Sequence, residues 1–148
     1  MNLTEQQKPK VQKSKEKPVP KTNQTAPAHQ SEKMFAIVRV RGTVKTPHYV
    51  KCTMEFLRLE RTNYCVIVPA TPSYAGMIQK VKDCVTWGEA DESTIKLLKE
   101  KLGEQKFYRL NPPRKGFGRK GIKTPFNKSG ALGYRGEKIN DLVARMVQ

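Results

Sequence analysis

Hydrophobic positions alternate with polar ones in three short runs of the chain. Residues 35–41 are rich in β-branched side chains, and their alternation puts three apolar residues on one face and Arg39 and Arg41 on the other. Residues 64–68 are too short and too β-branched for a helix, and residues 84–87 have the same character. These runs predict three strands, with the two arginines on the face opposite to the apolar positions.

The first helix is predicted between the first two strands. Thr46 followed by Pro47 favours a helix start, because threonine can cap the first amides and proline has no amide hydrogen to satisfy. Val50, Met54 and Leu57 then recur at helical spacing. Three more apolar side chains widen this predicted buried face: Cys52, Phe56 and Leu59.

Three further helices follow the same rules. One is expected to open at residues 71–73, and another at Asp91, which leads to leucines spaced by three and four and to Gly103 as a left-handed stop. Residues 137–146 carry apolar side chains on one side and predict a terminal helix that folds back onto the body. The repeated order of strand and helix predicts an α/β (α+β) fold with helices packed on a small sheet.

The segment before the terminal helix has no helical period. Residues 107–110 predict a strand that is ended by Asn111 and two prolines. In residues 114–133, glycine and proline recur too often for regular structure. We therefore expect an irregular or hairpin-like extension that stands off the core and is pinned at both ends.

The charge of this segment changes the picture. Residues 106–136 carry nine Lys and Arg side chains and no Asp or Glu, together with six of the ten glycines and five of the eleven aromatic residues. The chain of 148 residues has a net charge of +16, which favours a polyanionic partner. Cations interleaved with rings and flexible backbone are typical of RNA binding. No apolar run approaches the length of a membrane span, so RNA is favoured over a membrane.

The first 33 residues differ in composition from the rest. They are dominated by Lys, Gln, Pro, Thr and Ser and have a net charge of +4, so we expect a disordered basic arm. The arm is either a solvated leader without a role or a tail that becomes ordered along RNA. Composition thus divides the chain into this arm (1–33), an α/β core (34–103) and a basic extension with a C-terminal helix (104–148).

The chain has no convincing pattern for catalysis or for a cofactor. Residues 116–121 (GFGRKG) match the dinucleotide fingerprint, but Pro125 prevents the helix that this motif needs. His29 and His48 lie in no catalytic or metal-binding pattern, and the three cysteines have no zinc-site spacing. We predict a protein without metal or other cofactor that is not an enzyme. Without a secretion signal and with reduced cysteines, it is expected in the cytoplasm.

Six blocks of the sequence occur in order in one ribosomal family: residues 37–42 (IVRVRG), 57–63 (LRLERTN), 72–77 (PSYAGM), 85–89 (VTWGE), 121–126 (GIKTPF) and 130–139 (GALGYRGEKI). Over residues 34–148 the chain is similar to the large-subunit protein numbered thirty in bacteria and archaea, whose eukaryotic relatives are numbered seven. Bacterial members stop near the third strand, so the part beyond Trp87 resembles the longer archaeal and eukaryotic form. The length is closer to archaeal members.

The resemblance implies a ferredoxin-like core of three strands and two helices and a structural role in the large ribosomal subunit. It implies contacts with large-subunit rRNA, with 5S rRNA, which the long form helps to hold in place, and with neighbouring ribosomal proteins, but no small-molecule substrate. Carried over by position, the cations of the RNA-facing set are Arg39, Arg41, Arg58, Arg61, Arg114, Lys115, Arg119, Lys120, Lys123, Lys128 and Arg135.

The predicted mechanism is RNA binding without chemistry, in which Lys and Arg neutralise phosphates and release counterions. Phe117, flanked by two glycines, is the first candidate to stack on an unpaired base, followed by Phe126 or Tyr134, although each ring could instead fasten the extension to the core. The alternative is a nucleic-acid-binding protein off the ribosome, either an RNA chaperone or a DNA-compacting protein. An RNA-modifying enzyme would need a general base or a cofactor loop that the sequence does not contain.

Overall fold

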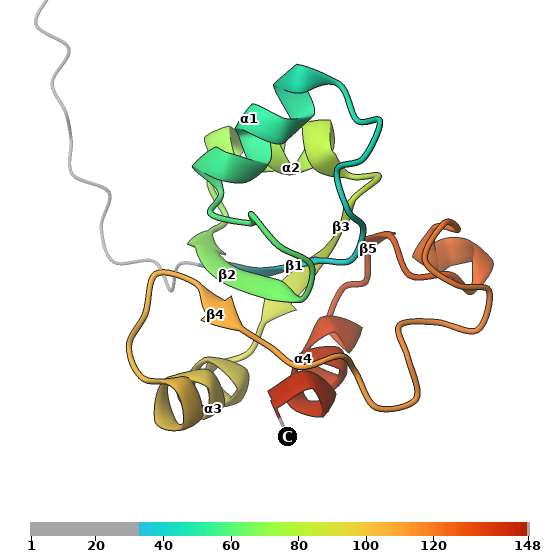
Figure 1. Cartoon of the computed structure of the whole chain (residues 1–148). Coiled ribbons are helices and arrows are strands. Elements are labelled where there is room, and N and C mark those ends of the chain that lie inside the picture. Colours follow the sequence, from blue (N-terminus) through green and yellow to red (C-terminus); the bar gives the residue numbers. More distant parts are fainter. Residues whose placement is uncertain (1–32, 148) are drawn as a thin grey trace, which may run out of the picture. The chain divides into compact units, whose positions relative to one another are not determined.

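A five-stranded sheet lies at the centre of the described part of the chain (Figure 1). The structure is a computed structural model that describes residues 33–147, so the predictions for His29 and for the arm before Lys33 lie outside it. The strands are β1 (Met34–Arg39), β2 (Tyr64–Pro69), β3 (Val85–Ala90), β4 (Tyr108–Arg109) and β5 (Gly133–Tyr134). Their order across the sheet is β4-β2-β1-β3-β5, and every pairing is antiparallel except that of β3 with β5.

Helices cover both faces of the sheet, as Figure 1 shows. They are α1 (His48–Phe56), α2 (Pro72–Val81), α3 (Glu92–Leu102) and α4 (Lys138–Val147). On the face covered by α1 and α2, Ile37 of β1 shares a buried cluster with Met54. On the face covered by α3 and α4, Val38 shares a second cluster with Leu98 and Leu142. Successive residues of β1 are thus buried on opposite faces, because the strand has core on both sides.

The predicted mixed fold is confirmed. The antiparallel strands β2, β1 and β3 with α1 and α2 agree with a ferredoxin-like core, and β4 and β5 widen the sheet by two short strands. The terminal helix was predicted correctly, since Ile139, Leu142, Val143 and Met146 of α4 are buried. No helix within residues 33–147 is long and apolar enough to cross a membrane.

Two expectations for the first helix were wrong. Pro47 rather than Thr46 occupies the N-cap position of α1, and no side chain caps the helix there. Phe56 was expected in the buried face, but its side chain is 80% exposed. The buried residues of α1 are Val50, Thr53 and Met54, which lie three and four positions apart and therefore on one face of the helix.

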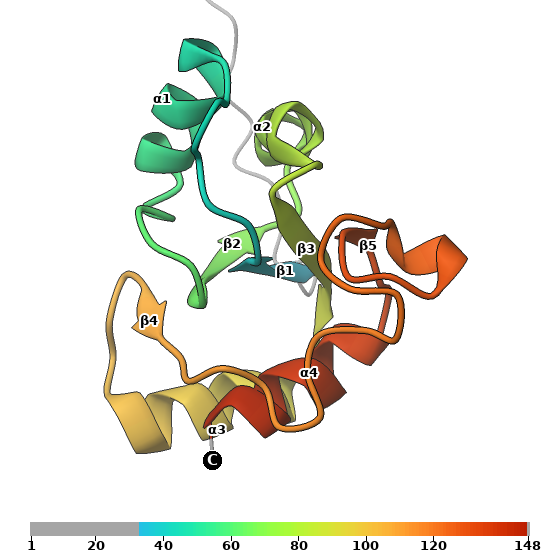
Figure 2. The ribbon, with the colours of Figure 1, turned by 45° about the vertical axis from the view of Figure 1, so that its right-hand side comes forward.

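The extension folds into a lobe that ends in β5 (Figure 2). We call residues 114–135 the basic lobe; it contains one short 3-10 helix, η1 (Phe126–Lys128). An ideal Cβ at Gly118 would lie 2.4 Å from the carbonyl oxygen of Gly130, and one at Gly130 would lie 2.1 Å from that of Thr124. Only glycine allows such backbone approaches, so the basic lobe is a packed structure rather than an open loop.

Candidate nucleic-acid interface

The basic lobe exposes six of its cations on a fixed backbone. The Lys120 amide donates to the Ser129 carbonyl at 3.0 Å, and the Ala131 amide donates to the Thr124 carbonyl at 2.9 Å. The lobe contains no acidic side chain, so its potential is positive. Fixed cations of this kind are suited to phosphate groups. The exposed cations are Arg114, Lys115, Arg119, Lys120, Lys123 and Lys128.

Arg135 was predicted to face RNA, but it is only 7% exposed. Its Nε donates to the Thr86 hydroxyl at 2.8 Å, and its Nη2 donates to the carbonyls of Phe117 at 2.7 Å and Ala131 at 3.0 Å. Its guanidinium also lies 4.7 Å from the centre of the Phe126 ring. Burial lowers the pKa of Arg135 to about 10, which leaves it charged at neutral pH. Arg135 therefore ties the basic lobe to β3.

Phe117 also fastens the lobe to the body. Its half-buried ring packs against the buried cluster under α4 and against Val40, Ala131 and Leu132. This is the alternative that the sequence left open for the aromatic rings. Tyr134 is half exposed, and its hydroxyl donates to a Glu89 carboxylate oxygen at 3.0 Å, a bond that raises the pKa of Tyr134.

A groove separates the basic lobe from the start and the outer side of α4. Its cavity volume is about 490 Å³. A second hollow, of about 480 Å³, shares Gly118, Arg119, Phe126 and Lys138 with it. We call the two together the lobe groove. The charged residues that line its first part are Lys115, Arg119, Arg135, Lys138, Asp141 and Arg145.

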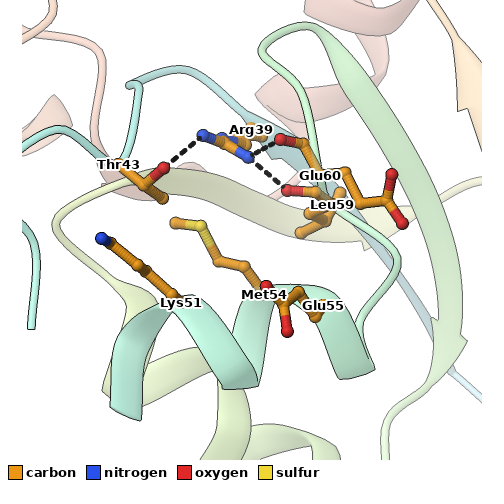
Figure 3. Close-up of a pocket in the computed structure, with 7 residues that line it drawn as sticks. All are labelled: Arg39, Thr43, Lys51, Met54, Glu55, Leu59 and Glu60. Carbon is orange, nitrogen blue, oxygen red and sulfur yellow. Dashed lines mark hydrogen bonds between the residues drawn. The ribbon is translucent and has the colours of Figure 1, made fainter. Parts of the chain in front are cut away.

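Arg39 was also predicted to face RNA, and it is 4% exposed. Its Nη1 donates to the Leu59 carbonyl at 2.6 Å and to the Glu60 carbonyl, and its Nη2 reaches the Thr43 hydroxyl at 3.4 Å (Figure 3). Figure 3 shows the Glu60 carboxylate turned away from this guanidinium. The face opposite to Val38 is buried under α1 and α2, which is why a cation on it is enclosed.

The pocket in Figure 3 has a volume of about 300 Å³. Figure 3 shows Met54 extending from α1 toward the guanidinium of Arg39, and Lys51 and Glu55 lie at the same helix. Burial lowers the pKa of Arg39. Because its donors are used by main-chain carbonyls and Thr43, Arg39 connects β1 to the segment after α1.

The other three predicted arginines lie nearer to solvent. Arg41 is half-buried, and its Nη1 donates to the Asp83 carbonyl at 3.3 Å. Arg58 and Arg61 are exposed in the turn between α1 and β2. β2 and β5 are separated by β1 and β3 in the sheet, so Arg58 and Arg61 form a group apart from the basic lobe.

Arg58 has an unusual backbone conformation, with φ of +57°. Its amide donates to the Glu55 carbonyl at 2.9 Å, and the next amide, of Leu59, donates to the Met54 carbonyl at 2.8 Å. These two bonds close α1 in a Schellman arrangement, in which glycine usually occupies the left-handed position.

Replacing Arg58 by glycine is expected to raise the free energy of unfolding by about 1 kcal/mol, because glycine adopts the left-handed conformation without steric cost. Urea denaturation measures this change. Arg61→Gly is the control, since Arg61 lacks a positive φ, and it should leave stability equal or slightly lower. A loss of stability in Arg58→Gly would contradict this account of the turn.

Sequence reasoning missed an aromatic cluster at the β4 edge. The rings of Tyr64 and Phe107 stack with centroids 5.4 Å apart, and the Arg109 guanidinium lies 5.9 Å and 5.8 Å from their centres. It also missed Lys138 and Arg145 in the lobe groove. Their spacing of seven puts them on one face of a helix, and this signal was available in the sequence.

No group of three or more His, Cys, Asp or Glu side chains that could hold a metal ion occurs among residues 33–147. Burial raises the pKa of the Cys65 thiol to about 12. A thiol with such a pKa is unreactive at neutral pH. Cys65 therefore acts as a core residue between α3, α4 and the sheet.

Comparison with known proteins identifies the family. The family described as Ribosomal protein L30p/L7e matches residues 35–85. Large ribosomal subunit protein uL30 of Nanoarchaeum equitans is 42% identical to this chain, in an alignment that covers 77% of this chain and 99% of the relative. The chain belongs to the uL30 family. The uL30 proteins of Methanoculleus marisnigri and Methanopyrus kandleri are 42% and 37% identical, over 76% and 73% of this chain and 99% and 100% of theirs.

Membership of the uL30 family confirms the resemblance predicted from the six blocks, including its archaeal character. It also confirms that the chain is not an enzyme, since uL30 proteins are ribosomal structural proteins. The matched residues 35–85 run from β1 to the start of β3. The basic lobe lies beyond them, but the alignments with whole archaeal uL30 proteins cover nearly all of each relative.

Proposed function

We propose that this uL30 protein is a structural constituent of the large ribosomal subunit that binds large-subunit rRNA and helps to hold 5S rRNA in place, in the cytoplasm. The relatives are named as large-subunit proteins. The observation that carries the RNA contact is the basic lobe, whose six exposed cations stand on a packed backbone with no acidic side chain. Neighbouring ribosomal proteins are the other expected partners.

The lobe is proposed to act by charge and shape together. Exposed Lys and Arg neutralise phosphates and release counterions. Arg135 and Phe117 stay inside and hold the lobe on the sheet, so the backbone is in place before RNA arrives. A surface that is ordered beforehand avoids the entropy of ordering on binding.

A second, smaller contact is proposed at the turn after α1. Arg58 and Arg61 are exposed there. The chain has an arginine at position 58 although the backbone is left-handed there and glycine would be less strained. Backbone strain retained at such a position supports a functional role. Arg39 is left out of the proposed interface because its guanidinium is used inside the fold.

Replacing Arg119 and Lys120 by alanine tests the main contact. Both side chains are exposed, so we expect an unchanged melting temperature and a several-fold lower share of the protein in large subunits. The measurement is sedimentation of a lysate in which the tagged variant competes with the untagged protein.

The matched control is Lys96→Ala with Lys101→Ala, which removes two exposed cations from α3. This pair should be incorporated as well as the parent chain. Equal incorporation of both variants would refute the basic lobe as the main anchor. A protein found only in the soluble fraction would refute the ribosomal function itself.

A further inference from the structure

The lobe groove combines a ring with cations on both of its walls. Phe126 lines both hollows, and Arg119 and Lys138 line both as well. Lys115 lies on the lobe side, and Arg145 lies on the α4 side. Each hollow lies within the range of volumes of sites for small organic ligands.

The groove has few negative charges. Asp141 is the acidic side chain in its lining, and it pairs with Arg145, whose Nε lies 3.3 Å from the carboxylate. Lys138 lies 5.9 Å from the centre of the Phe126 ring. The remaining positive charge attracts an anion, and the ring offers an apolar surface beside it.

The walls are held in place by bonds within the chain. Arg145 Nη1 donates to the Arg114 carbonyl at 3.1 Å and reaches the Gly116 carbonyl at 3.4 Å, which joins α4 to the start of the lobe. Arg135, under Phe126, is fixed by its bonds to β3 and to the lobe. The groove is therefore formed without a ligand.

We propose that the lobe groove takes one unpaired nucleotide of the bound RNA, with its base stacked on Phe126 and its phosphates between Arg119, Lys115 and Lys138. A base has a π-face that suits a ring whatever its identity. Duplex RNA keeps its bases stacked inside and offers phosphates alone. The groove thus favours a bulge or loop over a regular helix. This inference rests on the proposed function.

The test uses the full chain and two RNA hairpins that differ by one bulged nucleotide. We expect the bulged hairpin to bind roughly 5- to 150-fold more tightly, the range for stacking one base on an aromatic side chain. Phe126→Leu should remove this preference and leave binding to the paired hairpin unchanged. Fluorescence anisotropy at one salt concentration measures all four affinities.

Phe56→Leu is the matched control, because Phe56 is an exposed ring on α1, far from the lobe in the sequence. It should keep the full preference for the bulge. If Phe126→Leu lowers the melting temperature, a second measurement decides: a 4-thiouridine placed at the bulge should cross-link, in the parent protein, to residues 115–128 or to α4.

The outcomes separate this inference from the function on which it rests. Equal affinities for the two hairpins, or a cross-link outside the lobe groove, would overturn the nucleotide site while RNA binding stands. Failure to bind either hairpin would overturn the proposed RNA binding as well. A preference that survives Phe126→Leu in a folded variant would show that the ring is not the platform.

Discussion

Binding to large-subunit rRNA is expected to weaken by about 10³-fold when salt is raised from 50 to 200 mM. Six phosphate contacts give a loss of this size, because each neutralised phosphate releases condensed counterions. The basic lobe exposes six cations once Arg135 is counted as buried. Binding isotherms at four or five salt concentrations give the slope of log affinity against log salt.

The double substitution Arg119→Ala with Lys120→Ala should make that slope shallower by about 1.8, which is 0.9 for each lost phosphate contact. The pair Lys96→Ala and Lys101→Ala on α3 should leave the slope as it is. An affinity for rRNA that barely changes with salt would refute the electrostatic contact. A slope equally affected by both pairs would mean that the charge acts over the whole surface rather than through the lobe.

Arg135→Ala is expected to lower the free energy of unfolding by about 3 kcal/mol. The substitution removes the donor to the Phe117 and Ala131 carbonyls and to the Thr86 hydroxyl, and hydrogen bonds to charged groups are among the stronger ones. The Phe126 ring also loses the cation beneath it. Urea denaturation measures the stability, and hydrogen exchange should report faster exchange of lobe amides.

Arg135→Lys should recover part of the loss only, because an ammonium cannot reproduce the fork of guanidinium donors. Lys123→Ala is the control within the lobe, since Lys123 is exposed, and it should stay within about 0.5 kcal/mol of the parent chain. The pKa of Arg135, about 10, keeps the group charged from pH 6 to 9, so its effect should be constant there. An unchanged stability in Arg135→Ala would mean that the buried bonds are replaced by water.

The spacing of apolar residues predicted those helices and strands that are long enough for the spacing to repeat. The apolar spacing in α4 and the cap and proline at Thr71 and Pro72 were sufficient to locate two helices. Of the two edge strands, β4 lies within the strand predicted at residues 107–110, whereas β5 was not predicted, because a strand of two residues has no period to detect. β5 is a strand because it pairs with Thr86 and Trp87 of β3. These residues are distant in the sequence, so a local sequence pattern cannot reveal the pairing.

The buried arginines show where prediction of the site from the sequence fails. A prediction from sequence places positively charged side chains at the surface. Arg119 and Lys120 are indeed exposed, but Arg39 and Arg135 are buried. A guanidinium has several donors, so it can be enclosed where main-chain carbonyls converge on it. For Arg39 those carbonyls belong to residues as far along the chain as Glu60, and only the folded chain brings them together.

Because β5 and α4 follow β3 in the chain, the pairing of β5 with β3 can form only after the first three strands have been synthesised. β1, β2 and β3 are all available once residue 90 has emerged, and they can pair among themselves. The lobe cannot close until Arg135 reaches Thr86 and α4 supplies the opposite wall of the groove. A partly made chain thus contains the cations of the lobe before their positions are fixed, and the lobe groove is complete only once α4 has been made.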